Sequence, residues 1–277
     1  MILRRFIDHF RKQAWTAIAL DFIIVVLGVF IGIQVSNWNA ARAQRIDAAL
    51  YHDRLVADMR LEAYNYQVLR DYYRDVRKAA EQTYAGLTGA AALTDTSLVV
   101  SAFRASQFSW AERHRATFDE LVGSGNLDLI TDDDLRTLVT GYYGMALLEE
   151  VSLESQRSEY RRALRMTLSP GIHEALNAQC GDKQIEGAPD GYTTLDYPCD
   201  FRWPGDEIAA SADMLRADPA MPGLLRLRIA NLRAREFALA INWNTYRLDE
   251  FLASARRFQA PDFKTVILQR RRLQGRD

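Results

Sequence analysis

The sequence predicts an all-α protein, in which a single N-terminal transmembrane helix continues into an extracytoplasmic antiparallel bundle of long helices. The first observation behind this prediction is an apolar segment, residues 14–35, with one formal charge. The second is a seam of apolar residues at alternating steps of three and four, which begins after that segment. The third is that we find no apolar–polar alternation long enough to predict a strand.

The composition excludes one broad class of function. The chain has 277 residues, 35 basic and 36 acidic, and a formal net charge of −1. A nucleic-acid-binding protein needs a basic surplus, so we expect no nucleic-acid partner. Only four of the basic residues are lysine, which we attribute to codon usage and from which we infer no function.

The apolar segment has the length of one membrane crossing. Residues 14–35 would span about 33 Å as a helix, against a hydrocarbon core of about 30 Å. Asp21 is expected inside the membrane, because the uncharged run 22–33 alone is too short to cross. Residues 14–37 are therefore predicted to be a signal anchor. Ala41-Arg42-Ala43 also fits a cleaved signal peptide, but the apolar run is too long for one.

Flanking charge predicts the orientation. Four basic residues precede the segment and two follow it, which favours a cytoplasmic N-terminus: Arg4, Arg5, Arg11 and Lys12, then Arg42 and Arg45. The bulk of the chain would then lie in the periplasm, where Cys180 and Cys199 can form a disulfide. Residues 1–13 are predicted to be an amphipathic helix on the cytoplasmic face.

One face of the crossing is small and polar. Asp21, Gly28 and Gly32 fall within about 40° of one another, with Ser36 on the flank. Glycines four apart let helices approach closely, and a carboxylate at depth needs a partner. This face predicts a contact with a protein partner or with a second copy of the chain. Asp21 reaching headgroup water is the alternative, and a proton relay is disfavoured because only one helix spans.

The helical pattern continues without Pro or Gly as far as Gly86. We expect one rod whose seam packs against other helices, as bundle core in preference to a dimeric coiled coil. Glu62 and Thr83 are the two exceptions in the seam, which otherwise consists of Leu55, Met59, Tyr66, Leu69, Tyr73, Val76, Ala80 and Leu87.

Capping patterns predict the later helices. Thr94-Asp95 and residues 131–134 are typical of helix starts, and we interpret the acids of the second as dipole-stabilising caps in preference to a metal site. Residues 123–126 indicate a helix stop, with Ser124 structural. Long helices are predicted over 132–168 and 222–258, a short one between them to residue 177, and a solvated basic tail over 261–277.

Residues 178–207 form the one region predicted to be non-helical. It holds both cysteines and an aromatic group that we interpret as a recognition surface on a disulfide-pinned loop. The alternative is that these rings pack back onto the bundle. The aromatic residues are Tyr192, Tyr197, Phe201 and Trp203.

No pattern indicates an enzyme. His9, His52, His114 and His173 are scattered, and neither paired-histidine nor Cys-x-x-Cys spacing occurs. No Gly-rich phosphate loop occurs, and Glu150 with Glu154 is interpreted as a solvated face. We therefore expect no cofactor and no metal.

The segment DFIIVVLGVFIGIQVSNWNAAR resembles a family of bacterial single-pass membrane proteins of unknown function, and TFDELVGSGNLDLITDDDLR is similar to that family's second recurrent segment. The resemblance implies a bacterial inner-membrane protein with an extracytoplasmic helical domain, and it implies no activity. Its signature positions here are Asp21, Gly28, Gly32, Gln34, Asn37, Trp38 and Asn39. Trp38 also fits an interfacial anchor on physical grounds.

We therefore expect a membrane-anchored, non-enzymatic periplasmic helical protein that acts as an adaptor or accessory subunit through protein–protein contacts. Two alternatives stay open. One is a ligand-sensing bundle that signals through a partner. The other is an envelope hydrolase with an unrecognised site.

Overall fold

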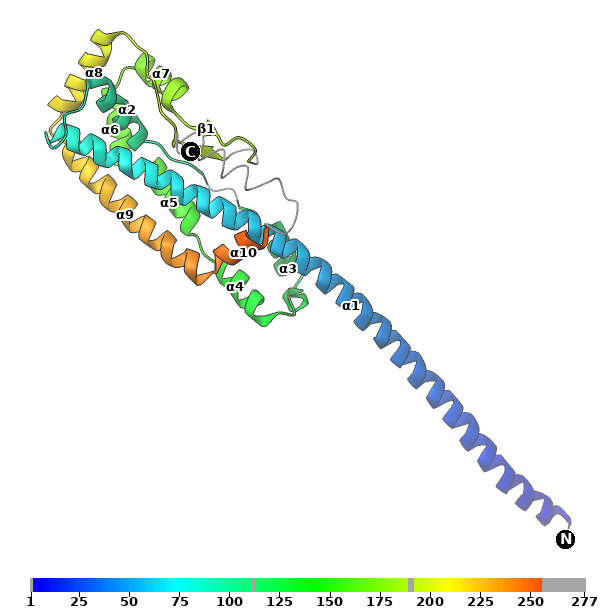
Figure 1. Ribbon diagram of the computed structural model, residues 1–277. Helices are drawn as coiled ribbons and strands as arrows, with labels where there is room; N and C mark the ends of the chain where they lie inside the picture. Colours follow the sequence, from blue (N-terminus) through cyan, green and yellow to red (C-terminus); the bar gives the residue numbers. More distant parts are fainter. Residues whose placement is uncertain (1, 111–112, 189–191, 256–277) are drawn as a thin grey trace.

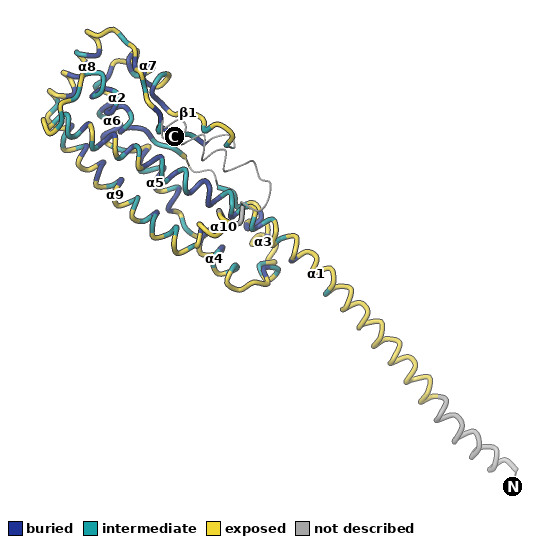
Figure 2. Tube along the Cα trace, viewed as in Figure 1, coloured by how far each residue is buried: buried dark blue, intermediate teal, exposed yellow. Residues whose placement is uncertain are grey.

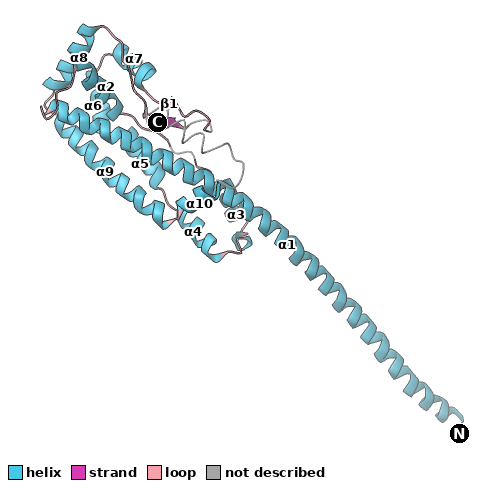
Figure 3. Ribbon diagram, viewed as in Figure 1, coloured by secondary structure: helices cyan, strands magenta, loops and turns pink. Residues whose placement is uncertain are grey.

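The computed structural model describes residues 2–110, 113–188 and 192–255, with the side chains of residues 2–17, 252, 254 and 255 outside that description. The expected all-α fold is confirmed (Figure 3), since a short hairpin, β1 (Lys183–Gln184) and β2 (Thr193–Thr194), is the only sheet in these ranges. The predicted basic tail, residues 261–277, lies outside the described residues.

One helix organises the molecule. α1 (Ile2–Leu87) has 86 residues and is about 129 Å long at 1.5 Å per residue. Its first part projects away from the rest of the chain (Figure 1), and residues 18–47 are exposed except for the half-buried Ala41. We call residues 18–47 the free half of α1. Burial begins near Ala48, where the helix enters the bundle (Figure 2).

The seam of α1 forms bundle core, as expected. All its positions from Leu55 to Ala80 are buried. The exceptions in the pattern, Glu62 and Thr83, are buried as well. The Thr83 hydroxyl is within hydrogen-bonding distance of two groups. Its Oγ1 lies 2.7 Å from the Ala79 carbonyl oxygen and 3.0 Å from Ser101 Oγ. The seam is therefore continuous, and two of its positions carry polar groups with partners inside the bundle.

Shorter helices pack around α1. In chain order they are α2 (Asp95–Ala105), α3 (Ala116–Gly123), η1 (Leu127–Leu129), α4 (Asp133–Tyr143), α5 (Leu147–Gln156), α6 (Glu159–Thr167), α7 (Pro170–Cys180), α8 (Gly205–Ala217), α9 (Met221–Thr245) and α10 (Leu248–Ala255). Thr94 and Asp132 cap α2 and α4 through their side chains, as predicted. Gly125 has a φ of +70°, a left-handed conformation that favours glycine in the turn after α3.

The prediction of one helix over 132–168 is wrong. The chain breaks at residues 144–146 and again at 157–158, which gives α4, α5 and α6. Gly144 ends α4, and the Ser158 side chain caps the start of α6 by accepting a hydrogen bond from the Arg161 amide. These breaks let each short helix turn its apolar side to the core, which a straight helix of that length could not do.

Two further boundaries differ from the prediction. Helices extend into the region 178–207 from both ends, because α7 runs to Cys180 and α8 starts at Gly205. The last helix, predicted to be continuous over 222–258, breaks at Arg247, whose φ is +51°. α10 can then fold back against α1 and α9, which buries Leu248.

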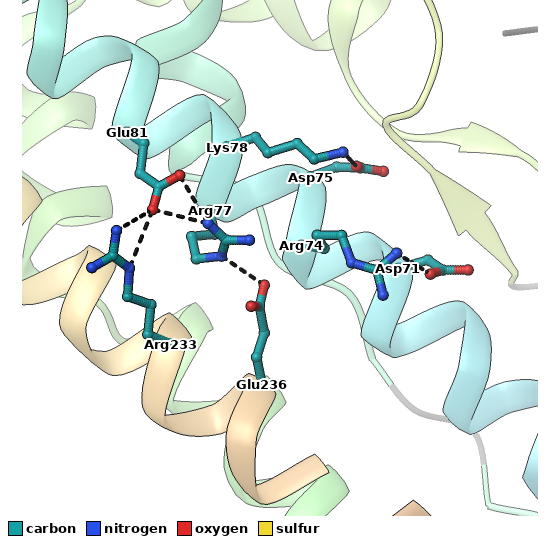
Figure 4. Close-up of polar contacts among 8 residues, drawn as sticks. All are labelled: Asp71, Arg74, Asp75, Arg77, Lys78, Glu81, Arg233 and Glu236. Carbon is teal, nitrogen blue, oxygen red and sulfur yellow. Dashed lines mark hydrogen bonds and ion pairs between the residues drawn. The ribbon is translucent and has the colours of Figure 1, made fainter. Parts of the chain in front are cut away.

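α9 runs beside residues 48–87 of α1, which form the bundle half of this helix. Ion pairs join the two helices (Figure 4). Arg77 Nε lies 2.9 Å from Glu236 Oε1, and Arg77 Nη1 lies 2.8 Å from Glu81 Oε2. Arg233 Nη2 approaches the same Glu81 carboxylate at 2.7 Å. Burial alone would raise the pKa of Glu81, but the hydrogen bonds from Arg233 and Arg77 hold it below its ordinary value.

Candidate functional site

The free half of α1 is the first candidate site. Its apolar part has a mean hydropathy of 2.6 with none of it buried, and it is long and apolar enough to cross a membrane. Asp21, Gly28, Gly32 and Ser36 are all exposed. A Cβ added to either glycine would meet nothing within 4 Å. No other segment in the described ranges therefore packs on the small, polar face that the sequence predicts.

Within the bundle, α1 contacts its neighbours on different sides. Tyr64 packs on Tyr192 of the 180–199 loop, with ring centroids 5.1 Å apart. Arg77 and Glu81 pair instead with residues of α9.

A stalk of exposed helix lies between the apolar part of α1 and the bundle. Trp38, the predicted interfacial anchor, is 61% exposed. Tyr51 binds the bundle through a hydrogen bond of 2.6 Å from its hydroxyl to Glu120. The thirteen helical steps from Trp38 to Tyr51 correspond to about 20 Å of helix. The bundle is thus held at a distance from any membrane that takes up the apolar part of α1.

The second candidate site is a buried polar centre around Glu62. Its side chain is completely buried on α1. Tyr142 of α4 donates its hydroxyl to Glu62 Oε2 at 2.5 Å, and Arg113 Nε lies 3.2 Å from the same oxygen. The backbone amide of His114 donates to Oε1. Arg113 also forms a salt bridge with Glu149 of α5, in which its Nη1 lies 2.6 Å from Glu149 Oε1. One carboxylate therefore joins α1, α4 and the segment before α3, with a bridge to α5.

The polar centre extends to the disulfide loop through His114. The Nε2 atom of His114 lies 2.9 Å from the Tyr192 hydroxyl. The Tyr143 hydroxyl donates to the His114 carbonyl at 2.8 Å. Burial raises the pKa of Tyr142 well above its ordinary value, and the neighbouring Glu62 raises it further. Both effects keep this phenol protonated, as a donor. Burial opposes the charge of Arg113, but Glu62, Tyr142 and Glu149 hold its pKa above the ordinary value.

This polar centre is suited to holding structure. The Glu62 carboxylate accepts hydrogen bonds from a guanidinium, a phenol and a backbone amide. Its side chain has no exposed surface that a substrate could contact. Within the described ranges, no three His, Cys, Asp or Glu side chains lie in an arrangement that could hold a metal ion. The centre therefore fixes helices from distant parts of the sequence to α1.

The aromatic loop corrects one prediction. The disulfide between Cys180 and Cys199 is present, with Cα atoms 5.4 Å apart. Tyr192, Tyr197 and Phe201 are buried, however, so the interpretation of these rings as a recognition surface is wrong. Trp203 is half-buried, and its indole donates to Glu207 at 2.8 Å. Apolar rings gain more from burial in the core than from exposure on a polar loop.

Arg104 anchors this loop. From α2 it donates to the Cys180 carbonyl at 3.2 Å and to the Tyr197 carbonyl at 3.0 Å. Its guanidinium also lies over the Tyr197 ring, 4.6 Å from the centroid. Tyr197 in turn donates its hydroxyl to the Gly181 carbonyl. The start and the end of the loop are thus bound to one side chain as well as to each other.

Sequence reasoning missed two other buried arginines. Arg228 of α9 donates to the carbonyls of Ala105 and Gln107, at 3.3 and 3.1 Å. Arg161 of α6 donates to the Ser106 carbonyl at 2.6 Å. Burial lowers the pKa of both, to about 10 for Arg161. They satisfy carbonyls at the end of α2, where a cation also favours the helix dipole. The sequence contains many arginines, and nothing in the sequence position of Arg161 or Arg228 distinguishes a buried arginine from an exposed one.

The fold and these sites define a class of protein: an all-α domain built around one half of a helix whose other half is long and apolar enough to cross a membrane. No family model, curated protein or solved structure matches this chain. The family resemblance of the segments around Asp21 and residues 117–136 accordingly stays a prediction.

Proposed function

We propose that this protein is a bacterial inner-membrane adaptor or accessory subunit, anchored by α1 with its N-terminus in the cytoplasm and its bundle in the periplasm. It acts without catalysis, through protein–protein contacts. One observation carries the proposal. The Asp21, Gly28 and Gly32 face is exposed along its whole length, and no described part of the chain packs on it.

The physical argument concerns the environment of Asp21. A carboxylate costs several kcal/mol or more in hydrocarbon, so a spanning helix keeps one where a partner helix or a water-filled contact receives it. Gly28 and Gly32, four residues apart, provide the flat surface that such a helix needs for close approach. The partner supplies the polar group for Asp21, because the described part of this chain brings none to it.

Three further observations support the location. Basic residues precede the apolar segment in excess, as in helices with a cytoplasmic N-terminus. The Cys180–Cys199 disulfide belongs to an oxidising compartment. The resemblance of residues 21–42 to single-pass bacterial membrane proteins agrees with both.

The proposal is tested by crosslinking the full-length protein in native membranes, extracting it in mild detergent and identifying what co-purifies. A stoichiometric partner should be present for the unaltered chain and lost for Asp21→Asn and for Gly32→Leu. Ala19→Leu is the matched control, because it introduces the same side chain about 160° around the helix from Asp21, and it should keep the partner. A partner that persists in Asp21→Asn and Gly32→Leu, or no partner at all, would overturn the proposal.

A further inference from the structure

α9 has apolar residues on two opposite sides. One side faces the core through Leu225, Leu232 and Leu239, which are all buried. The other side faces solvent. Leu227, Phe237 and Ile241 are 49%, 69% and 49% exposed, and the exposed Ala230 and Ala234 lie between them. We call these five residues the α9 stripe.

The α9 stripe has the spacing of a coiled-coil seam. Its members follow one another at steps of three, four, three and four, which is the pattern of a and d positions in a heptad repeat. A helix that only covers a core needs one apolar side. A second apolar side with this repeat indicates a helix that also packs against another helix.

For a pair of copies, the charges beside the α9 stripe favour the parallel over the antiparallel orientation. Arg226 and Arg233 lie on one flank, at g positions, while Asn231 and Ala238 lie on the other, at e positions. In a parallel pair each arginine flank faces the Asn231 and Ala238 flank of the other copy. In an antiparallel pair the two arginine flanks would face each other, which is unfavourable.

Anchoring imposes the parallel orientation. All copies held in one membrane by α1 point the same way, so their α9 helices, which run alongside α1, are parallel to one another. Two α9 stripes can then meet in register around a two-fold axis. Confinement to the membrane also raises the effective concentration, so that a contact smaller than that of a soluble dimer is sufficient.

We infer that the α9 stripe is the interface of a parallel homodimer, formed by α9 of one copy on α9 of the other. The inference rests on the proposed membrane anchoring. The α9 stripe lies in the bundle and the Asp21 face lies in the free half of α1, so each protomer keeps its Asp21 face free for a different partner within the membrane. The protein is then a two-sided adaptor that brings two copies of its membrane partner together.

Cysteine crosslinking tests the geometry directly. Both native cysteines are in the disulfide, so an introduced cysteine is the only free thiol. Leu227→Cys, Ala234→Cys and Ile241→Cys are each made in the full chain and oxidised in native membranes. All three should give a covalent dimer, because in-register parallel helices bring each position next to its own copy. Met214→Cys on α8, which is 44% exposed, is the matched control and should give none.

A second variant tests whether packing drives the contact. Phe237→Arg in the Ala234→Cys background should lower the dimer yield by at least about tenfold, since an unpaired guanidinium would be buried in the seam. Unchanged yield would overturn the inference. So would a dimer from Ala234→Cys alone, which indicates an antiparallel pair, or equal yields from the stripe and from Met214→Cys, which indicate random collision.

The two proposals fail in different ways. In one outcome, the protein sediments with membranes and the Asp21→Asn variant no longer co-purifies with the partner, but the cysteines of the α9 stripe do not crosslink. Only the homodimer is then wrong. A stripe cysteine that crosslinks only to another protein also overturns the homodimer. If the protein is not in the membrane fraction, both proposals fail.

Discussion

Glu62 Oε2 of α1 lies 3.2 Å from Arg113 Nε, and these two residues, 51 positions apart, form a salt bridge in which the glutamate side chain is completely buried. Glu62 is one of the two polar positions in the seam of α1, and the other is Thr83. Such a salt bridge contributes little net stability compared with apolar residues, but removing one member leaves the other charge buried without its partner.

We therefore expect Glu62→Ala to lower the free energy of unfolding by roughly 3–5 kcal/mol. The measurement is urea unfolding of the full-length protein in mild detergent, followed by circular dichroism. Glu149→Ala is the control, because it removes the other partner of Arg113 at a 40% exposed position. It should cost about 1 kcal/mol or less. Equal losses for the two variants would show that Glu62 does not hold the centre together.

Asp182 should oppose folding at neutral pH. Burial raises the pKa of this carboxyl, although Tyr72 donates to it at 2.7 Å. The unfolded chain then loses the proton first as the pH rises from about 4, so stability is lost as the pH rises through the folded pKa. Because Asp182 as a residue is exposed, solvent screens the effect, so Asp182→Asn should be only slightly more stable than the unaltered chain at pH 7 and equal to it at pH 3.

Thermal unfolding of the full-length protein at both pH values measures this difference. Asp200→Asn, at a position 79% exposed, is the matched control and should change neither midpoint. A lower midpoint for Asp182→Asn at pH 7 would mean that the attraction between Asp182 and Arg161 outweighs the cost of burial.

Glu81 should act in the opposite direction. Burial would raise its pKa, but the hydrogen bonds from Arg233 and Arg77 hold it below the ordinary value. The stabilisation is thus present above about pH 4.5 and lost as the pH falls through the folded pKa. Glu81→Gln should cost about 1 kcal/mol or less at pH 7 and nothing near pH 3. Urea midpoints across this range are the measurement, with Asp213→Asn as an exposed control.

The disulfide should stabilise the bundle. Cys180 and Cys199 close a loop with a sequence separation of 19, and removing such a bond costs roughly 2–4 kcal/mol. The double variant Cys180→Ser, Cys199→Ser should unfold at correspondingly lower urea. The unaltered chain in reducing buffer should move by the same amount. A variant that unfolds at the same urea concentration as the oxidised protein would show that Arg104 and the buried rings hold the loop without the bond.

Local patterns predicted much of this fold because they report local physics. The seam of α1 follows from the helical period, and the starts of α2 and α4 follow from the side-chain caps Thr94 and Asp132. The breaks near Gly144, Ser158 and Arg247 were not predicted, because each depends on where the next helix finds core to cover. The burial of Tyr192 and of Tyr197 depends in the same way on Tyr64 and on Arg104, respectively, which are far away in sequence.

The sequence alone determined the all-α class, the long apolar helix, the polar face at Asp21 and the cysteine pair, since each is written in spacing or composition over a few turns. Only the tertiary structure decided which groups the buried charged residues bind, because their partners are distant in sequence. These residues are Glu62, Arg113, Arg161 and Arg228. The tertiary structure also decided that one apolar side of α9 is core and the other is free. Both sides have helical spacing, and only packing distinguishes them.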